Sequence, residues 1–99
     1  MNNLYVVATP IGNLDDTSER VIRTLHDVDL IAAEDTRVTR KILSRFKINT
    51  AITSYHEHNK HRKLPILLEA LTKHDVALVS DAGIPGISDT ATELVSAAA

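Results

Sequence analysis

The chain contains no cysteine, and only three of its 99 residues are aromatic. The absence of cysteine excludes a disulfide framework, a thiolate metal site and a cysteine nucleophile. Because aromatic rings are scarce and hydrophobic residues still make up 43% of the chain, a core must be built from Val, Ile, Leu and Ala. That composition is typical of a small parallel sheet covered by helices.

Long apolar runs are also missing. The segment 4–8 is apolar, but it is too short for the core of a signal peptide and no basic residues precede it. No run approaches the length needed to cross a bilayer. At 99 residues the chain is one domain at most. We therefore expect a cytoplasmic protein that has no contact with a membrane.

Charge is unevenly distributed, although the net charge is only −2. The window 37–63 holds eight of the eleven basic residues and one acidic residue, which gives it a charge of +7, whereas the remainder carries −9. Such segregation indicates a surface that faces a polyanion. The alternative is two basic helix faces that are simply solvated. The basic residues of the window are Arg37, Arg40, Lys41, Arg45, Lys47, Lys60, Arg62 and Lys63.

Short apolar runs alternate with stretches of helical spacing. Strands are predicted at residues 4–8, 28–33, 51–55 and 76–80, each followed by a loop and a helix. The first run is wholly apolar, so we expect it to be buried on both faces. Four β-loop-α units predict an α/β fold, a mainly parallel sheet with helices on both faces and ligand loops at the carboxyl ends of its strands.

Polar residues at the helix starts predict the caps. We expect Thr17 or Ser18 to cap the first helix, Thr36 the second, and Ser88 or Asp89 the last. Glu93 is placed for a capping box in that last helix. In the third helix, proline is tolerated only in the first turn, so Pro65 is expected there.

Two loops, 9–13 and 81–89, carry glycine and proline directly after predicted strands. Glycine lets the backbone approach a ligand, and proline stiffens the turn. Neither loop matches a dinucleotide or triphosphate fingerprint, and both could be ordinary turns. The second loop is the better candidate for a ribose or amine contact, because Asp81 and Asp89 bracket its glycines.

The charged group Glu34-Asp35-Thr36-Arg37 ends the second predicted strand. A carboxylate here could act as a general base toward a hydroxyl if burial raised its pKa. The alternative is structural: Thr36 caps the following helix, and Asp35 or Glu34 forms a local ion pair with Arg37. Spacing alone favours the structural interpretation.

Three histidines lie in the segment 55–61, where His56, His58 and His61 could ligate zinc. Nearby lysine and arginine side chains would repel a cation, and no cysteine completes a site, so we expect no metal. Contact with nucleic acid fits better, because Tyr55 could stack on a base while His, Asn and Lys reach phosphate or a 2′-hydroxyl. A solvated loop is the alternative.

Four segments taken together resemble a known family. Residues 4–16 (LYVVATPIGNLDD), 33–37 (AEDTR), 55–59 (YHEHN) and 79–89 (VSDAGIPGISD) are similar, in order and spacing, to the ribosomal RNA small-subunit cytidine 2′-O-methyltransferases. These belong to the tetrapyrrole methylase superfamily, the class III methyltransferases that use S-adenosylmethionine. The resemblance covers essentially the whole chain and implies that residues 1–99 form the N-terminal domain of the tetrapyrrole methylase fold.

The resemblance implies the function and its residues. The full-length protein would methylate the 2′-hydroxyl of a cytidine in 16S ribosomal RNA of the small subunit, using S-adenosylmethionine, and would form a homodimer. The expected cofactor contacts are Pro10, Asp81, Ala82, Gly83, Ile84 and Ile87. The expected RNA contacts are Arg37, Arg40, Lys41, His56, His58 and Asn59. The motifs assign no general base, so Asp35 and Glu34 stay candidates.

Two departures limit the comparison. Where the family continues Ser-Asp-Pro-Gly, this chain has Thr90-Ala91 after Ser88-Asp89. The chain also ends inside a predicted helix, so we expect a second α/β domain to be missing and the 99 residues alone to be inactive. One alternative is a methylase of a tetrapyrrole or corrin precursor, against which the +7 window argues. Another is a non-catalytic α/β binding module.

Overall fold

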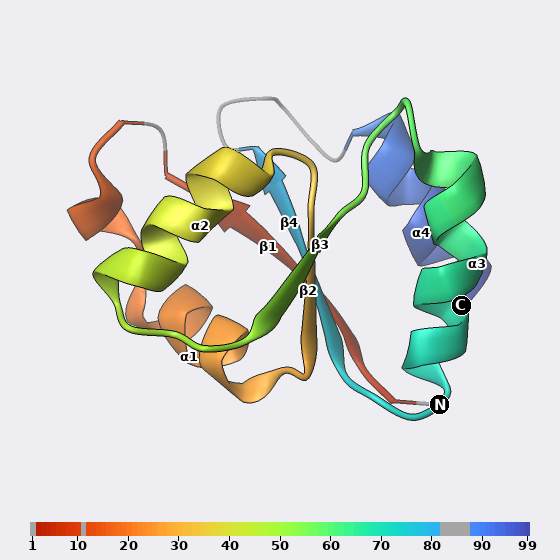
Figure 1. Cartoon of the computed structure of the whole chain (residues 1–99), viewed down its shortest axis with the longest axis horizontal. Helices are drawn as coiled ribbons and strands as arrows, with labels where there is room; N and C mark the ends of the chain where they lie inside the picture. The colour runs from red at the N-terminus through yellow and green to blue at the C-terminus, as the bar shows by residue number, and fades with distance from the viewer. Residues whose placement is uncertain (1, 11, 82–87) are drawn as a thin grey trace.

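The computed structural model describes residues 2–10, 12–81 and 88–99, which form a four-stranded sheet between two pairs of helices (Figure 1). In chain order the elements are β1 (Leu4–Thr9), the short 3-10 helix η1 (Leu14–Asp16), α1 (Glu19–Asp27), β2 (Leu30–Ala33), α2 (Thr36–Arg45), β3 (Ala51–Ser54), α3 (Lys60–Leu71), β4 (Val76–Asp81) and α4 (Asp89–Ala98). Each strand is followed by a helix, which confirms the predicted fold class. The one shift of more than a residue is at β2, which begins at Leu30, because Val28 caps the end of α1.

The strand order is β1-β4-β2-β3, and every neighbouring pair is parallel. Thr9 lies opposite Asp81, and Ala33 lies opposite both Val79 and Ser54. All four strands therefore end at one side of the sheet, which we call the carboxyl edge. The loops that follow the strands all begin there.

Two separate cores cover the two faces of the sheet. On one face α1 and α2 bury Leu25, Ile42 and Leu43 against strand residues such as Ile31. On the other face α3 and α4 bury Leu67, Leu71 and Leu94 against Leu78 and its neighbours. Figure 1 shows these helix pairs on opposite sides of the sheet. Burial of aliphatic side chains at about 25 cal/mol per Å² drives both contacts.

β1 corrects one prediction. It lies at the edge of the sheet, and Tyr5 and Val6 are each 40% exposed, so the strand is not buried on both faces. A hollow of about 610 Å³ runs between this strand and α1. An apolar run predicts a hydrophobic strand, but it does not predict whether another strand or helix covers that strand.

The helix caps are partly as predicted. Ser18 caps α1, and Ser88 caps α4 by accepting a hydrogen bond from the Ala91 amide at 3.1 Å. The prediction for α2 was wrong, because Asp35, not Thr36, is its cap. The capping box is also wrong, since with Ser88 as cap the third helical residue is Ala91, and Glu93 bonds elsewhere.

Pro65 lies one turn deeper in α3 than predicted. The helix begins at Lys60, so the proline falls in the second turn, where it cannot donate to the carbonyl of His61. Both residues are exposed, so water can satisfy that carbonyl. Among the described residues, no helix is both long enough and apolar enough to cross a membrane.

Candidate functional site at the carboxyl edge

All four predicted motifs follow strands that end at the carboxyl edge. The strands that lead into these motifs end at Thr9, Ala33, Ser54 and Asp81, and the ladder continues past the strands where the Tyr55 amide donates to the Ala33 carbonyl at 2.9 Å. α1 and α2 leave this edge toward one face of the sheet, and α3 and α4 leave toward the other. The connections after neighbouring strands thus turn to opposite faces of the sheet, and this is the kind of place where open α/β sheets bind ligands.

The first loop, after β1, is ordered by its own polar groups. Thr9 is buried and Pro10 half-buried, and Gly12 has a φ of +83°, with nothing within 4 Å of where a Cβ would stand. The Asn13 side chain accepts a hydrogen bond from the Asp15 amide at 3.0 Å. The Arg45 guanidinium, on α2, forms an ion pair with Asp15, with 2.9 Å between Nη2 and Oδ1. A ligand could therefore approach the Gly12 backbone, and the residues that follow it are held in place by the contacts of Asn13 and Asp15.

Both the backbone and the side chain of Arg37 bind Asp35. Its Oδ1 accepts hydrogen bonds from the amide of Arg37 at 3.0 Å and from Nε of the same residue at 3.3 Å. The hydrogen bond from the Arg37 side chain is the largest cause that holds the pKa of Asp35 below its usual value. The expected local ion pair with Arg37 is present, and the aspartate itself has the capping role expected of Thr36.

Glu34 has a different environment from its neighbour. It is half-buried between β2 and α4, and its Oε1 accepts a hydrogen bond from the hydroxyl of Ser88. The Glu34 amide continues the ladder by donating to the Val79 carbonyl at 3.3 Å. This carboxylate is not paired with a cation among the described residues. It is therefore the better placed of the two candidate bases.

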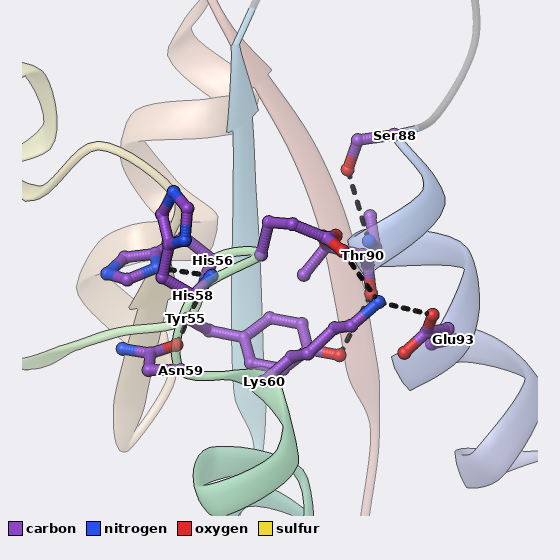
Figure 2. A network of polar contacts seen from close by, with 10 residues as sticks. Tyr55, His56, His58, Asn59, Lys60, Ser88, Thr90 and Glu93 are labelled. Atoms are coloured by element: carbon purple, nitrogen blue, oxygen red, sulfur yellow. Dashed lines mark hydrogen bonds and ion pairs between the residues drawn. The ribbon is translucent and has the colours of Figure 1, made fainter.

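The histidine segment is braced by Asn59. The Asn59 Oδ1 accepts from the His56 amide at 2.8 Å, and its Nδ2 donates to Ser54 Oγ at 2.9 Å. His56 Nδ1 accepts from the His58 amide at 3.1 Å, which leaves Nε2 as the ring nitrogen that faces away from this bond. His58 is exposed and His56 half-buried. Asn59 thus orients the segment, and the two imidazoles remain its outward groups (Figure 2).

Tyr55 overturns a prediction. Its side chain is fully buried, so it cannot stack on a base, and its hydroxyl donates to the Thr90 carbonyl at 2.9 Å. Burial is the largest cause that raises the pKa of this phenol, so the hydroxyl stays protonated as a donor. The sequence suggested an exposed aromatic because the residues after it are polar.

The basic window is divided by the fold. Arg37, Arg40 and Lys41 lie on α2 and are exposed, whereas Arg62 and Lys63 lie on α3, which covers the opposite face. Three of the eight cations have carboxylate partners: Arg37, Arg45 and Lys60. Both helices start at the carboxyl edge, α2 after β2 and α3 after β3, so the cations of the window lie on both sides of the sheet.

The structure joins residues that the sequence did not connect. Lys60 contacts Glu93 across 33 residues of the chain, and the Tyr55 hydroxyl contacts the Thr90 carbonyl across 35 (Figure 2). Thr90 also contacts Glu57, 33 residues away. No spacing pattern reveals such pairs, because they depend on how α3 and α4 pack. Of the predicted cofactor contacts, Ala82, Gly83, Ile84 and Ile87 lie outside the described residues. Asp81 is placed as the last residue of β4, and Asp89 is an exposed first residue of α4.

Parallel strands whose loops gather at one edge define an α/β ligand-binding domain. Within that class, the model of the tetrapyrrole (corrin/porphyrin) methylases matches residues 3–99, and the chain belongs to this family. A solved structure of diphthine synthase shares the fold, with a TM-score of 0.76 at 15% identity over 98% of this chain and 39% of that one.

Relatives of known name are close in sequence. The chain is 57% identical over 98 residues to ribosomal RNA small subunit methyltransferase I of Synechocystis sp.. It is 56% and 52% identical over 96 residues to the proteins of that name from Halalkalibacterium halodurans and Bacillus subtilis. The alignments cover 96–98% of this chain and 33–35% of the relatives, so the chain spans about one third of their length. The resemblance drawn from the four motifs is confirmed at the level of the family.

Proposed function

We propose that the full-length protein containing this chain methylates the 2′-hydroxyl of a cytidine in 16S ribosomal RNA, with S-adenosylmethionine as methyl donor. The observation that carries the proposal is the gathering of all four motif segments at the carboxyl edge, in a chain 51–57% identical to proteins named for methylating small-subunit ribosomal RNA. A ribosomal substrate implies a cytoplasmic protein. By analogy with its family, we expect a homodimer.

The proposed cofactor site begins where β1 and β4 end side by side. Pro10 and Asp81, with Ala82, Gly83, Ile84 and Ile87 after it, would hold S-adenosylmethionine. The fit is supported by the half-buried Pro10, the open backbone at Gly12 and the divergence of α1 and α4 at this point. The sulfonium of the cofactor supplies an activated methyl group, so the chain's own residues must mainly align the acceptor hydroxyl.

Glu34 is the proposed general base. Transfer breaks the bond between the methyl carbon and sulfur, forms a bond between that carbon and the 2′-oxygen, and releases the hydroxyl proton, which a carboxylate can accept. Glu34 lies at the carboxyl edge with no cation paired to it in the described part of the chain, whereas Asp35 is bound by Arg37. Glu34→Gln should lower kcat by roughly 10²-fold or more. Asp35→Asn, which keeps the helix cap, is the matched control and should leave kcat within a few fold.

The proposed RNA contacts are Arg37, Arg40, Lys41, His56 and His58, with Asn59 orienting the two histidines. The exposed cations on α2 can neutralise phosphates, and the imidazoles can donate to phosphate or sugar oxygens. Positively charged side chains on both sides of β3 match a polyanion better than a small macrocycle.

The proposal is tested by methyl transfer from labelled S-adenosylmethionine to isolated small ribosomal subunits, followed by digestion of the RNA to nucleosides. We expect the label in 2′-O-methylcytidine. Label in a methylated base, or transfer to a tetrapyrrole precursor and not to RNA, would contradict it. The 99-residue chain alone should show no transfer above background.

A further inference from the structure

The first turn of α4 is held from three directions by residues far away in the sequence. Ser88 donates to Glu34 at the end of β2. The Thr90 carbonyl accepts from the buried Tyr55 hydroxyl at 2.9 Å, and the Thr90 hydroxyl donates to Glu57 Oε2 at 2.8 Å. Figure 2 shows Tyr55 and Lys60 reaching the first turns of α4, at Thr90 and Glu93. The Ser88 side chain already caps the helix, so the bonds to Thr90 are additional to an ordinary N-cap.

Lys60 extends this contact set, which we call the α4 clamp: Tyr55, Glu57, Lys60 and Glu93 around the turn at Thr90. The Lys60 Nζ lies 2.8 Å from Glu93 Oε1 and 3.0 Å from Glu57 Oε1, and its side chain is only 13% exposed. Hydrogen bonds to these two carboxylates hold its pKa above the usual value for lysine, so it stays charged. One cation thus ties the start of α3 to α4 and also orients the carboxylate that binds Thr90.

The α4 clamp joins the segment proposed to bind RNA to the helix that follows the segment proposed to bind the cofactor. Residues 55–60 contain the imidazoles proposed for RNA, and the segment 82–87, proposed for the cofactor, joins α4 at Ser88. The described residues on either side of that segment are held by contacts. Asp81 pairs with Thr9 in the sheet, and Ser88 begins the first turn of α4, which the α4 clamp binds. Precise placement of backbone around a ligand needs a rigid supporting shell.

We propose that Tyr55, Glu57 and Lys60 are positioning residues, which hold the first turn of α4 and thereby set the affinity of the site for S-adenosylmethionine. The inference rests on the proposed function, and it adds that the RNA-facing segment and the cofactor-facing segment share one support. None of the three residues is among the proposed cofactor contacts. A change in the clamp should therefore alter cofactor affinity by displacing α4, with no contact to the ligand removed.

The test uses the full-length protein and two matched variants. Tyr55→Phe removes only the hydroxyl bound to the Thr90 carbonyl. Thr50→Val removes a comparable hydrogen bond, from the Thr50 hydroxyl to the Leu25 carbonyl at 2.7 Å, at the opposite edge of the sheet. Both should lower Tm by a similar few degrees. We expect Tyr55→Phe to raise the Kd for S-adenosylmethionine by up to about fivefold, because the free energy of the lost hydrogen bond bounds the effect, and Thr50→Val to leave it within twofold.

A second pair of variants tests the charged part of the clamp. Glu57→Gln and Lys60→Met should each weaken binding of S-adenosylmethionine, and together they should weaken it by less than the product of the two effects, because they break one contact set. Glu69→Gln, an exposed change on the same helix, is the control and should have no effect.

The outcomes are distinct. If the wild-type protein binds S-adenosylmethionine but Tyr55→Phe and Thr50→Val change its Kd equally, the clamp only stabilises the fold and this inference is overturned while the proposed function stands. If the wild-type protein binds no S-adenosylmethionine in titration calorimetry, both are overturned. Multiplicative effects of the Glu57 and Lys60 variants would contradict their action as one unit.

Discussion

Adjacent carboxylates at the end of β2 have unlike roles because of what lies beside them. Asp35 faces the start of α2, where the amide and guanidinium of Arg37 bind it. Glu34 turns toward α4 and meets only the Ser88 hydroxyl among the described polar partners. Asp35 is therefore bound by a cation, whereas Glu34 has no cation partner among the described residues and is the carboxylate we propose as the base. Neighbouring positions can differ this much because the chain turns here from β2 into α2: Glu34 still bonds to β4 through its amide, whereas Asp35 is already the cap of the helix.

The stability contributed by Asp35 should depend on pH. Its pKa is lowered in the folded state, so its contribution is present above the pKa it has in the unfolded chain, near 4, and is lost as pH falls through the lower folded value. Asp35→Asn keeps a capping side chain but removes the charge. We expect the wild-type protein to exceed this variant in free energy of unfolding at pH 7, with the gap closing toward pH 3.

Urea titrations at several pH values measure that gap. Asp27→Asn, at an exposed carboxylate for which only a long histidine contact at 3.8 Å is found, serves as the control. A gap that stays constant down to pH 3 would show that the Asp35 charge does not stabilise the fold.

The elements themselves show where packing overrides local preference. α3 continues through Pro65 because Leu67 and Leu71 bury their side chains in the core shared with α4. β1 shows the converse: a wholly apolar strand lies at an edge, with Tyr5 and Val6 exposed. Periodicity identified both elements, but it could not place the helix start or the edge, since both depend on contacts with other elements.

Replacing Pro65 with alanine should stabilise the protein. The change restores an amide that can donate to the carbonyl of His61, and the exposed ring contributes little to the core. The gain should lie between about 1 and 3 kcal/mol, the upper value being the helix penalty of proline. Chemical denaturation measures it, and an exposed Glu69→Ala variant in the same helix gives the baseline. A loss of stability would mean that the ring packs against its surroundings.

At the scale of the whole molecule, the fold could be predicted and the site only in part. Four strand-helix units and the loops after each strand follow from apolar periodicity and from glycine and proline. The clamp could not be predicted, because Tyr55, Lys60 and Glu93 come together only when α3 and α4 pack on one face. The same packing buries Tyr55, which the sequence predicts to stack on a base. It also divides the basic window between the two faces of the sheet.

The divided basic window makes a prediction about salt. If about six phosphates are neutralised, affinity of the full-length protein for small-subunit RNA should fall roughly 10³-fold between 50 and 200 mM salt. Arg40→Glu with Lys41→Glu should lower affinity and flatten the salt dependence, because both side chains are exposed on α2. Lys73→Glu, an exposed cation outside the window, should matter less. Equal effects of the two changes in filter binding would mean that the window is only a solvated surface.

The central claim is that the carboxyl edge, and not another part of the domain, receives both ligands. Hydrogen exchange of the full-length protein with and without ligands tests it most directly. We predict that S-adenosylmethionine protects segments 9–13 and 80–91, and that small-subunit RNA protects segments 34–41 and 56–60. The opposite edge, at residues 26–30, 47–51 and 72–76, should be unchanged. Protection at that opposite edge, with none at the carboxyl edge, would contradict the account.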